Sequence, residues 1–254
     1  MVAAIGVTFS ITMFIALLSF MSGLNTLLDG LILNRTPHIL LFNEIKPSDQ
    51  QPIDKSVSFK GFYNFISSIK PKKKRAEIYN SGATIAALNK DDRVIGVAPR
   101  ITAQVFYNVG LVDLTGIISG IDVEEENKLF LFKDYVVSGD YMDLKNIPNS
   151  IILGKGVADK MLVQIGDMIQ VTTSRGEQVQ LKVVGNFQSG IREFDNAQSY
   201  CSMKTTQKML GESSNFVTDI QIKIKDILSA PAVAKDYEKL FELDAVDIQT
   251  ANAQ

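Results

Sequence analysis

An uninterrupted apolar segment opens the chain: VAAIGVTFSITMFIALLSFM occupies Val2–Met21, and no charged residue follows until Asp29. About 20 apolar residues, at about 1.5 Å of rise each, cross a hydrocarbon core of about 30 Å. A helix also satisfies its own backbone hydrogen bonds there, so the segment predicts a transmembrane helix. The alternatives are a buried core helix and a secretory signal peptide. The signal peptide fits poorly, because the segment lacks a basic n-region, a short apolar core and a small-residue cleavage motif.

The helix is expected to continue beyond the apolar segment. Leu24, Leu27, Leu28 and Leu31, here called the leucine stripe, follow the i, i+3, i+4, i+7 spacing of one helix face. The helix should end before Pro37, because a residue that precedes proline is disfavoured in helical geometry. Two interpretations remain open for the stripe: packing against the chain's own folded domain, or pairing with another membrane helix.

Composition excludes several classes of protein. The chain has 254 residues and a formal net charge of -2, so it lacks the basic surface expected of a general nucleic-acid binder. The remaining two hundred or so residues are enough for one large domain or two small ones. A single cysteine, Cys201, excludes an intrachain disulfide and any multi-cysteine metal site. It falls in an expected strand, which favours a small buried hydrophobe over a reactive thiol.

Hydrophobic periodicity and turn residues predict alternating strands and helices after Pro37. We expect strands at His38–Phe42, Arg93–Ala98 (ending at Pro99), Ile101–Tyr107, Leu111–Ile121, Ile151–Leu153, Met168–Thr173, Gln178–Phe187, Ser199–Met203, Val217–Lys225 and Ala245–Gln249. We expect helices at Phe59–Ile69, Gly82–Asn89, Val157–Val163 and Ile227–Phe241. We expect surface loops at Asn43–Ser58 and at the basic run Pro71–Arg75, and an irregular segment at Gln188–Asn196. The acids Glu124–Glu126 are expected to begin a helix and to be solvated.

These elements predict an α+β fold with two lobes. Strand-helix-strand units at both ends of the soluble part flank a middle that is rich in strands. We therefore expect a membrane and stalk helix at residues 1–36, an α+β lobe from residues 37–100 and 205–254, and a β-rich lobe from residues 101–204.

The sequence offers no constellation for catalysis, metal binding or a cofactor. The only histidine, His38, lies beside the expected membrane exit without a nucleophile motif, which favours a structural role. Gly154-Lys155-Gly156 resembles a phosphate-binding loop only superficially, because the residue after Lys155 is not Ser or Thr. The acids Glu124–Glu126 lack the spacing of a calcium loop. We expect a protein that is not an enzyme and has no cofactor.

Several segments together resemble the type VII ABC transporter permeases, the group of MacB, LolC, LolE and FtsX. The similarity lies in the long first helix followed by TPHILLF, GATIAALNKDDRVIGVAPRI, ILGKGVADKMLVQIGDMIQV, VVGNFQSGIREFDN and a last strand-helix-strand unit. It covers nearly the whole chain and is strongest to the lipoprotein-releasing LolC and LolE branch. In this family the two lobes are called porter and sabre.

The resemblance implies the first membrane helix and periplasmic domain of an exporter permease in the bacterial inner membrane, with residues 35–254 in the periplasm. Its transport substrate would be a lipoprotein or another amphiphile. The implied partners are a cytoplasmic ABC ATPase, a second permease subunit, membrane lipid, and a periplasmic lipoprotein carrier or adaptor. Met21 and the leucine stripe would line an acyl-chain path or a helix interface, and the turn Ser174-Arg175-Gly176-Glu177 would contact a partner.

The chain also departs from the family pattern. A full permease has a cytoplasmic helix before this stretch and three spanning helices after it, so we expect a fragment. LolC-type subunits extend the hairpin near Val171–Gln178 into a longer hook that captures the carrier, whereas the turn here is short, which favours a LolE-like subunit. The alternatives are an FtsX-like transmitter that regulates a periplasmic hydrolase, a MacB-like efflux permease, and an unrelated membrane-anchored binding module. The transported molecule and the identity of the partner permease remain open.

Overall fold

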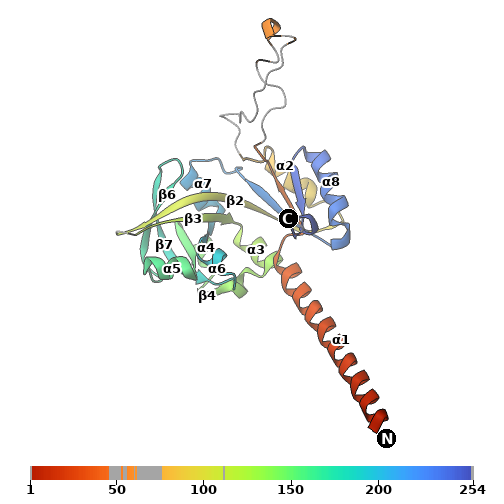
Figure 1. The fold of residues 1–254 in the computed structure, drawn as a ribbon. Helices are drawn as coiled ribbons and strands as arrows, with labels where there is room; N and C mark the ends of the chain where they lie inside the picture. Colours follow the sequence, from red (N-terminus) through yellow and green to blue (C-terminus); the bar gives the residue numbers. More distant parts are fainter. Residues whose placement is uncertain are drawn as a thin grey trace.

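The computed structural model (Figure 1) describes residues 2–45, 53, 56–59, 61, 76–110 and 112–252. The helix α1 (Val2–Arg35) projects away from the folded body and carries the N-terminus at its far end. It runs without a break past Met21 and ends before Pro37, as predicted. Within it, Ser10 Oγ donates to the Gly6 carbonyl at 2.9 Å and Thr12 Oγ1 to the Thr8 carbonyl at 2.8 Å, so these hydroxyls are satisfied inside the helix.

Strands from the two ends of the soluble part form one antiparallel region of the sheet. Its order is β10 (Asp244–Asp247), β1 (Ile39–Phe42), β9 (Asp219–Ile224) and the first half of β2 (Val94–Val109). The helices α2 (Ser81–Leu88) and α8 (Ala230–Phe241) share its core, which includes Ile39, Leu41, Ile78, Leu88, Val97, Ile220, Ile222, Ile224, Val233 and Tyr237. The short helices of this part of the chain are η1 (Val57–Phe59), η3 (Ile227–Ser229) and α9 (Ile248–Asn252).

The strand β9 is buried on both faces, and the two faces differ in chemistry. Ile220, Ile222 and Ile224 belong to the core shared with the helices. Alternate residues of a strand point to opposite faces, so Gln221 and Lys223 face the other way. On that side lies α3 (Val123–Phe130), and Lys223 Nζ donates to the Leu129 carbonyl of α3 at 2.8 Å. A polar sheet face therefore holds this helix.

A second group of strands closes into a ring. Pairings run from β2 through β3 (Val112–Ile121), β8 (Gln198–Ser202), β5 (Ser150–Gly154), β7 (Gln178–Phe187) and β6 (Met168–Thr173), and β6 pairs back with β2. Its core comprises apolar side chains that include Val105, Tyr107, Ile118, Ile151, Leu153, Ile169, Val171, Leu181, Val183 and Cys201. Closure satisfies the strand edges, since each strand in the ring has two neighbours.

Smaller elements cover the ring and its junction with the antiparallel region. They are η2 (Phe132–Tyr135), β4 (Val136–Gly139), α4 (Asp143–Asn146), α5 (Lys155–Met161), α6 (Arg192–Asp195) and α7 (Met203–Leu210). The α+β class predicted from the sequence is confirmed. The division into lobes at residues 100 and 205 stays a prediction, because β2 runs continuously from one region into the other.

Four predictions about elements are corrected. The strand predicted at Arg93–Ala98 does not end at Pro99 but continues through it as part of β2. Pro99 pairs with Ile220 of β9 on one side, and pairing with β3 on the other side begins only at Arg100. No neighbouring strand therefore needs the N–H group that proline lacks. The acids are not all solvated, since Glu126 is buried. Gln188–Asn196 contains α6, and the closing strand ends at Asp247, where α9 takes over. The expected helix Phe59–Ile69 and the basic run Pro71–Arg75 lie largely or wholly outside the described residues.

Candidate functional site

A cavity of about 550 Å³ opens where α1 meets the folded body. It is bounded by the residues that directly follow α1 and by segments of α3, η2, β2, β7, β8, β9 and α6. The lining residues are Thr36, Pro37, Arg100, Glu126, Phe130, Phe132, Tyr135, Phe187, Ser189, Ile191, Phe194, Tyr200 and Gln221. Most of them are aromatic or apolar, and we call this cavity the junction pocket.

Aromatic rings from separate elements form one continuous wall of the junction pocket. Tyr200 packs edge-on against Phe132, with centroids 4.8 Å apart at 63°, and against Phe187, at 5.0 Å and 71°. Phe187 in turn meets Phe194 of α6 at 6.0 Å and 70°. Edge-to-face contacts of this kind are favourable because the positive ring edge meets the negative ring face. The wall is therefore an ordered aromatic surface.

The hydroxyl of Tyr200 has no hydrogen-bond partner among the described residues, although its side chain lines the pocket and the residue is only 6% exposed. Burial raises the pKa of this phenol well above its ordinary value, so it stays protonated and can donate. In contrast, the hydroxyl of Tyr107, a fully buried residue, lies 2.5 Å from Ser199 Oγ. The Tyr200 hydroxyl is therefore a neutral donor that the protein leaves available to the junction pocket.

The polar side of the pocket is already paired within the protein. The Arg100 guanidinium forms an ion pair with the Glu126 carboxylate, and Arg100 Nε donates to Glu126 Oε2 at 3.2 Å. With its amide oxygen turned to the guanidinium, Gln221 accepts from Arg100 Nη1 at 2.8 Å. Burial disfavours the charged guanidinium, but the Glu126 carboxylate together with Tyr200 and Asp219 outweighs this effect and raises the pKa of Arg100. The pocket therefore carries no unmatched charge from this pair.

The helix α6, which supplies Phe194, is fixed from both sides. The Asp195 carboxylate accepts from Ser189 N and Ser189 Oγ, both at 2.7 Å, and from Gly190 N at 3.3 Å. A Cβ added at Gly154 would collide with the Asp195 carbonyl, and one added at Gly156 with the Asn196 side chain. This close approach accounts for the two glycines around Lys155 without a phosphate, and Lys155 itself pairs with Asp159 at 2.6 Å.

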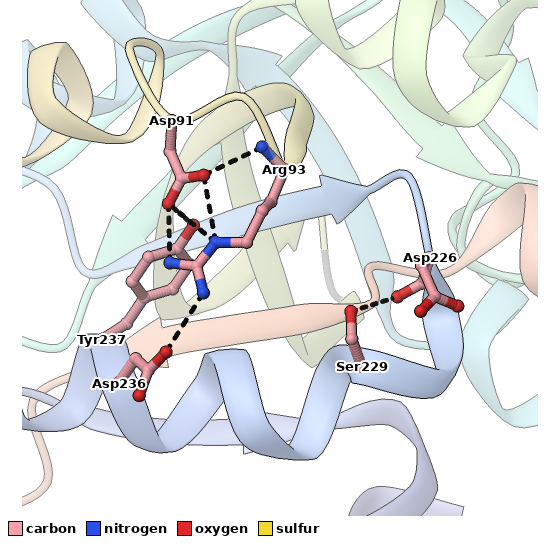
Figure 2. A network of polar contacts seen from close by, with 6 residues as sticks. All are labelled: Asp91, Arg93, Asp226, Ser229, Asp236 and Tyr237. Carbon is pink, nitrogen blue, oxygen red and sulfur yellow. Dashed lines mark hydrogen bonds and ion pairs between the residues drawn. The ribbon is translucent and has the colours of Figure 1, made fainter.

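A separate polar network fixes α8 to the turn before β2 (Figure 2). Arg93 bonds Asp91 at 2.8 Å and Asp236 of α8 at 3.1 Å, and the Tyr237 hydroxyl donates to Asp91 at 2.9 Å. The hydrogen bond from Arg93 is the largest cause that holds the pKa of Asp91 well below its usual range. Burial and the Asp91 carboxylate raise the pKa of Tyr237 to about 12. This network is structural and lies outside the junction pocket.

The two groups of site residues predicted from the sequence lie on different parts of the structure, one on α1 and one on the ring. Met21 and Leu24 lie exposed on α1, while the side chains of Leu27, Leu28 and Leu31 are outside the described part of the structure. The turn Ser174–Glu177 joins β6 to β7 on the ring, which Figure 1 shows on the side of the body away from α1. There Arg175 pairs with Glu212 at 2.5 Å and donates to the Leu210 carbonyl at 3.0 Å, which fixes the turn against the end of α7.

Only one weak signal for the junction pocket is present in the sequence. Phe130, Phe132 and Tyr135 are concentrated in a short stretch. Phe187, Phe194 and Tyr200 join them only through the pairing of β5, β7 and β8, which spacing along the chain does not reveal.

His38 is buried beside β9, with Nδ1 3.2 Å from Ile224 N, in the structural role predicted for it.

Comparison with known proteins gives consistent matches. The model of the MacB-like periplasmic core domain family matches residues 1–240. The lipoprotein-releasing system transmembrane protein LolC of Neisseria meningitidis serogroup B (strain ATCC BAA-335 / MC58) is 24% identical over 257 residues, which cover 97% of this chain and 54% of that protein. LolC of Xylella fastidiosa (strain 9a5c) is 29% identical over 161 residues, 60% of this chain and 38% of that protein. The chain thus spans about half the length of these relatives, or less.

Two solved structures share the fold. The extracellular domain of the noncanonic ABC-type transporter YknZ from Gram-positive bacteria gives a TM-score of 0.51 at 14% identity, covering 80% of this chain and 92% of that one. The periplasmic region of MacB from Actinobacillus actinomycetemcomitans gives 0.52 at 13% identity, with coverages of 85% and 90%. Both relatives cited above carry the name LolC, so the preference for a LolE-like subunit stays a prediction.

Proposed function

Because the chain belongs to the MacB-like periplasmic core domain family of the type VII ABC transporter permeases, we propose that it is the first membrane helix and periplasmic domain of an exporter subunit for lipoproteins or similar amphiphiles. Members of this family are the permease components that work with ABC ATPases, and the chain is a membrane-anchored protein of this type. We further propose that the chain lies in the bacterial inner membrane, with residues 35–254 in the periplasm.

The continuity of α1 supports the proposal. Its segment Gly6–Leu24, with a mean hydropathy of 1.9, is the one candidate membrane span among the described residues, and none of it is buried in the folded body. The same helix continues to Arg35, so residues 25–35 extend it by about 16 Å at 1.5 Å of rise per residue. An exposed apolar helix that continues without a break toward a folded domain supports a role in transmitting motion.

The route for that motion runs through α3. The end of α1 lies beside α3, and α3 is attached to the sheet by the Arg100–Glu126 ion pair and by Lys223. Burial lowers the pKa of Lys223, which donates to the Leu129 carbonyl. In our proposal, ATP is hydrolysed by a separate cytoplasmic subunit, α1 tilts, and α3 carries the tilt to the sheet as a rigid-body movement.

The names of the relatives support lipoproteins as the substrate class, since both matched proteins are called lipoprotein-releasing. The second permease subunit and a periplasmic carrier or adaptor follow from the same reasoning as proposed partners. The turn Ser174–Glu177 stays a candidate contact for such a partner. Its attachment through Arg175 would present Gly176 and Glu177 in a fixed geometry.

Reconstitution tests the proposal. The full-length permease and its ATPase are placed in vesicles that hold a purified lipoprotein, and release into solution is measured with ATP and with a non-hydrolysable analogue. We expect release with ATP and no release with the non-hydrolysable analogue. ATP hydrolysis without release of any lipoprotein, together with ATP-dependent activation of a periplasmic hydrolase, would replace the exporter with the FtsX-like transmitter.

A further inference from the structure

The junction pocket has the size and chemistry of a ligand site. Its volume of about 550 Å³ falls within the roughly 300 to 1,000 Å³ of small-molecule pockets. Its walls are mainly aromatic, with Phe132, Phe187, Phe194 and Tyr200 in successive contact. Such a surface favours an extended apolar group, because burial of apolar area is the main driving force.

The polar groups narrow the choice of ligand. The charge of Arg100 is matched by Glu126, and Gln221 uses its amide oxygen on the same guanidinium, so the pocket does not select an anion or a cation through them. The Tyr200 hydroxyl makes no hydrogen bond with any described residue. Among the described residues, Asn186 Oδ1 is the only fully buried side-chain polar atom without a partner, so the Tyr200 hydroxyl keeps some access to the pocket. A ligand that covers this hydroxyl would leave it unsatisfied unless the ligand itself carries an acceptor, which favours a ligand with a neutral acceptor.

The position of the pocket indicates where such a ligand comes from. Thr36 and Pro37, directly after α1, form part of its lining. Residues 25–35 place this lining about 16 Å along the helix from the end of the apolar span. An apolar group that leaves the bilayer along α1 would therefore meet the junction pocket at the point where the helix joins the folded body.

We propose that the junction pocket binds one acyl chain of a membrane-derived amphiphile, with the Tyr200 hydroxyl donating to the ester or amide carbonyl that links the chain to the rest of the molecule. The chain lies against the aromatic wall, and the carbonyl lies toward Tyr200. This inference rests on the proposed function for the source of the chain, but binding itself needs neither ATP nor a partner subunit.

The absence of tryptophan from the chain makes a clean fluorescence test possible. Phe194→Trp places a single reporter in the pocket wall, at a position that is 39% exposed and so has room for a larger ring. The full chain is held in nanodiscs of ordinary phospholipid and titrated with a dibrominated stearoyl amide, whose bromines quench tryptophan at short range. Phe106→Trp, on β2 outside the pocket and 42% exposed, is the matched control.

We expect saturable quenching of the tryptophan in the Phe194→Trp chain and little in the Phe106→Trp chain. In the Phe194→Trp background, Tyr200→Phe removes only the hydroxyl and should weaken binding of the amide about fivefold, the range of one net hydrogen bond. Tyr107→Phe removes a buried hydroxyl outside the pocket and should leave the affinity unchanged. A dibrominated alkane without a carbonyl should bind the Tyr200→Phe chain at least as tightly as the chain that keeps Tyr200, because the alkane offers the hydroxyl no acceptor.

Three results would overturn the inference. They are no saturable quenching in the Phe194→Trp chain, equal quenching at both reporter positions, and an affinity for the amide that Tyr200→Phe does not change. Each can occur while ATP-dependent lipoprotein release persists in vesicles, so failure here is separable from failure of the proposed function. Conversely, acyl-chain binding without any release would leave the pocket assignment standing and refute the exporter role.

Discussion

The guanidinium of Arg100 and the carboxylate of Glu126 form a buried ion pair that joins β2 to α3, with side-chain exposures of 17% and 3%. The Phe130 ring lies 5.9 Å from the Arg100 guanidinium, and Gln221 adds a further hydrogen bond. The pair therefore does two things: it holds α3 on the polar face of the sheet and it closes one side of the junction pocket.

Glu126→Gln should lower the free energy of unfolding by about 3 kcal/mol, because it leaves a buried guanidinium without a counter-charge. Thermal unfolding of the full chain in detergent, followed by circular dichroism, measures the change. The double variant Arg100→Met with Glu126→Leu is the control, and it should recover most of the loss since neither charge remains. If Glu126→Gln melted like the wild type, the pair would not hold α3.

Asp91→Asn should cost about 1 kcal/mol at neutral pH, because Arg93 is half exposed and solvent screens the pair. The pKa of Asp91 is lower in the folded protein than in the unfolded chain. Its stabilisation is therefore complete above about pH 4 and is lost as the pH falls further toward its folded pKa. Melting curves across this range should show the variant and the wild type converging in acid, and a constant gap would contradict the assignment.

Gly154→Ala tests how α6 is positioned. The added methyl group would collide with the backbone carbonyl of Asp195 in α6, so we expect a loss of about 1 to 3 kcal/mol. The control is Gly82→Ala in α2, because Gly82 has open space around it. Gly166→Ala would not serve, because Gly166 has a positive φ. Gly82→Ala should be neutral or stabilising. Equal melting temperatures for the two variants would mean that the end of β5 does not approach α6 as described.

Cys201 provides an internal control for topology. Its thiol is fully buried, and burial raises its pKa, so it should not react in the folded protein. Ser174→Cys adds an exposed thiol on the β6–β7 turn. In cells with an opened outer membrane, a membrane-impermeant maleimide should label Ser174→Cys but not the wild type. Labelling of Ser174→Cys only after lysis of the inner membrane would place the domain in the cytoplasm.

Local patterns in the sequence predicted most elements well. The hairpin of β6 and β7 has the predicted bounds, because strict alternation and a Ser-Arg-Gly-Glu turn act within a few residues. Long-range pairing is a different matter. The closure of the ring through β2 and β6 joins Phe106 to Thr172, and no local signal encodes that contact.

The candidate site was the least predictable part for the same reason. Glu126 is one of three consecutive acids, a pattern that predicts a solvated side chain. It is buried instead, because Arg100, 26 positions away in the sequence, lies opposite it. The aromatic wall likewise depends on strands that are adjacent in space and distant in sequence. The long first helix, by contrast, needs only its own residues, and its course to Arg35 was predicted correctly.

A charge placed on α1 tests whether this helix links the membrane to the folded domain. In the full-length permease, Leu28→Glu puts a charge on the leucine stripe, where contact with lipid or another helix would make its desolvation costly. Asp29→Asn changes the neighbouring position off the stripe and is the matched control. ATP-dependent lipoprotein release from vesicles is measured beside ATP hydrolysis at equal protein level. We predict that Leu28→Glu abolishes release and Asp29→Asn leaves it unchanged, whereas equal release by Leu28→Glu and wild type would contradict the account.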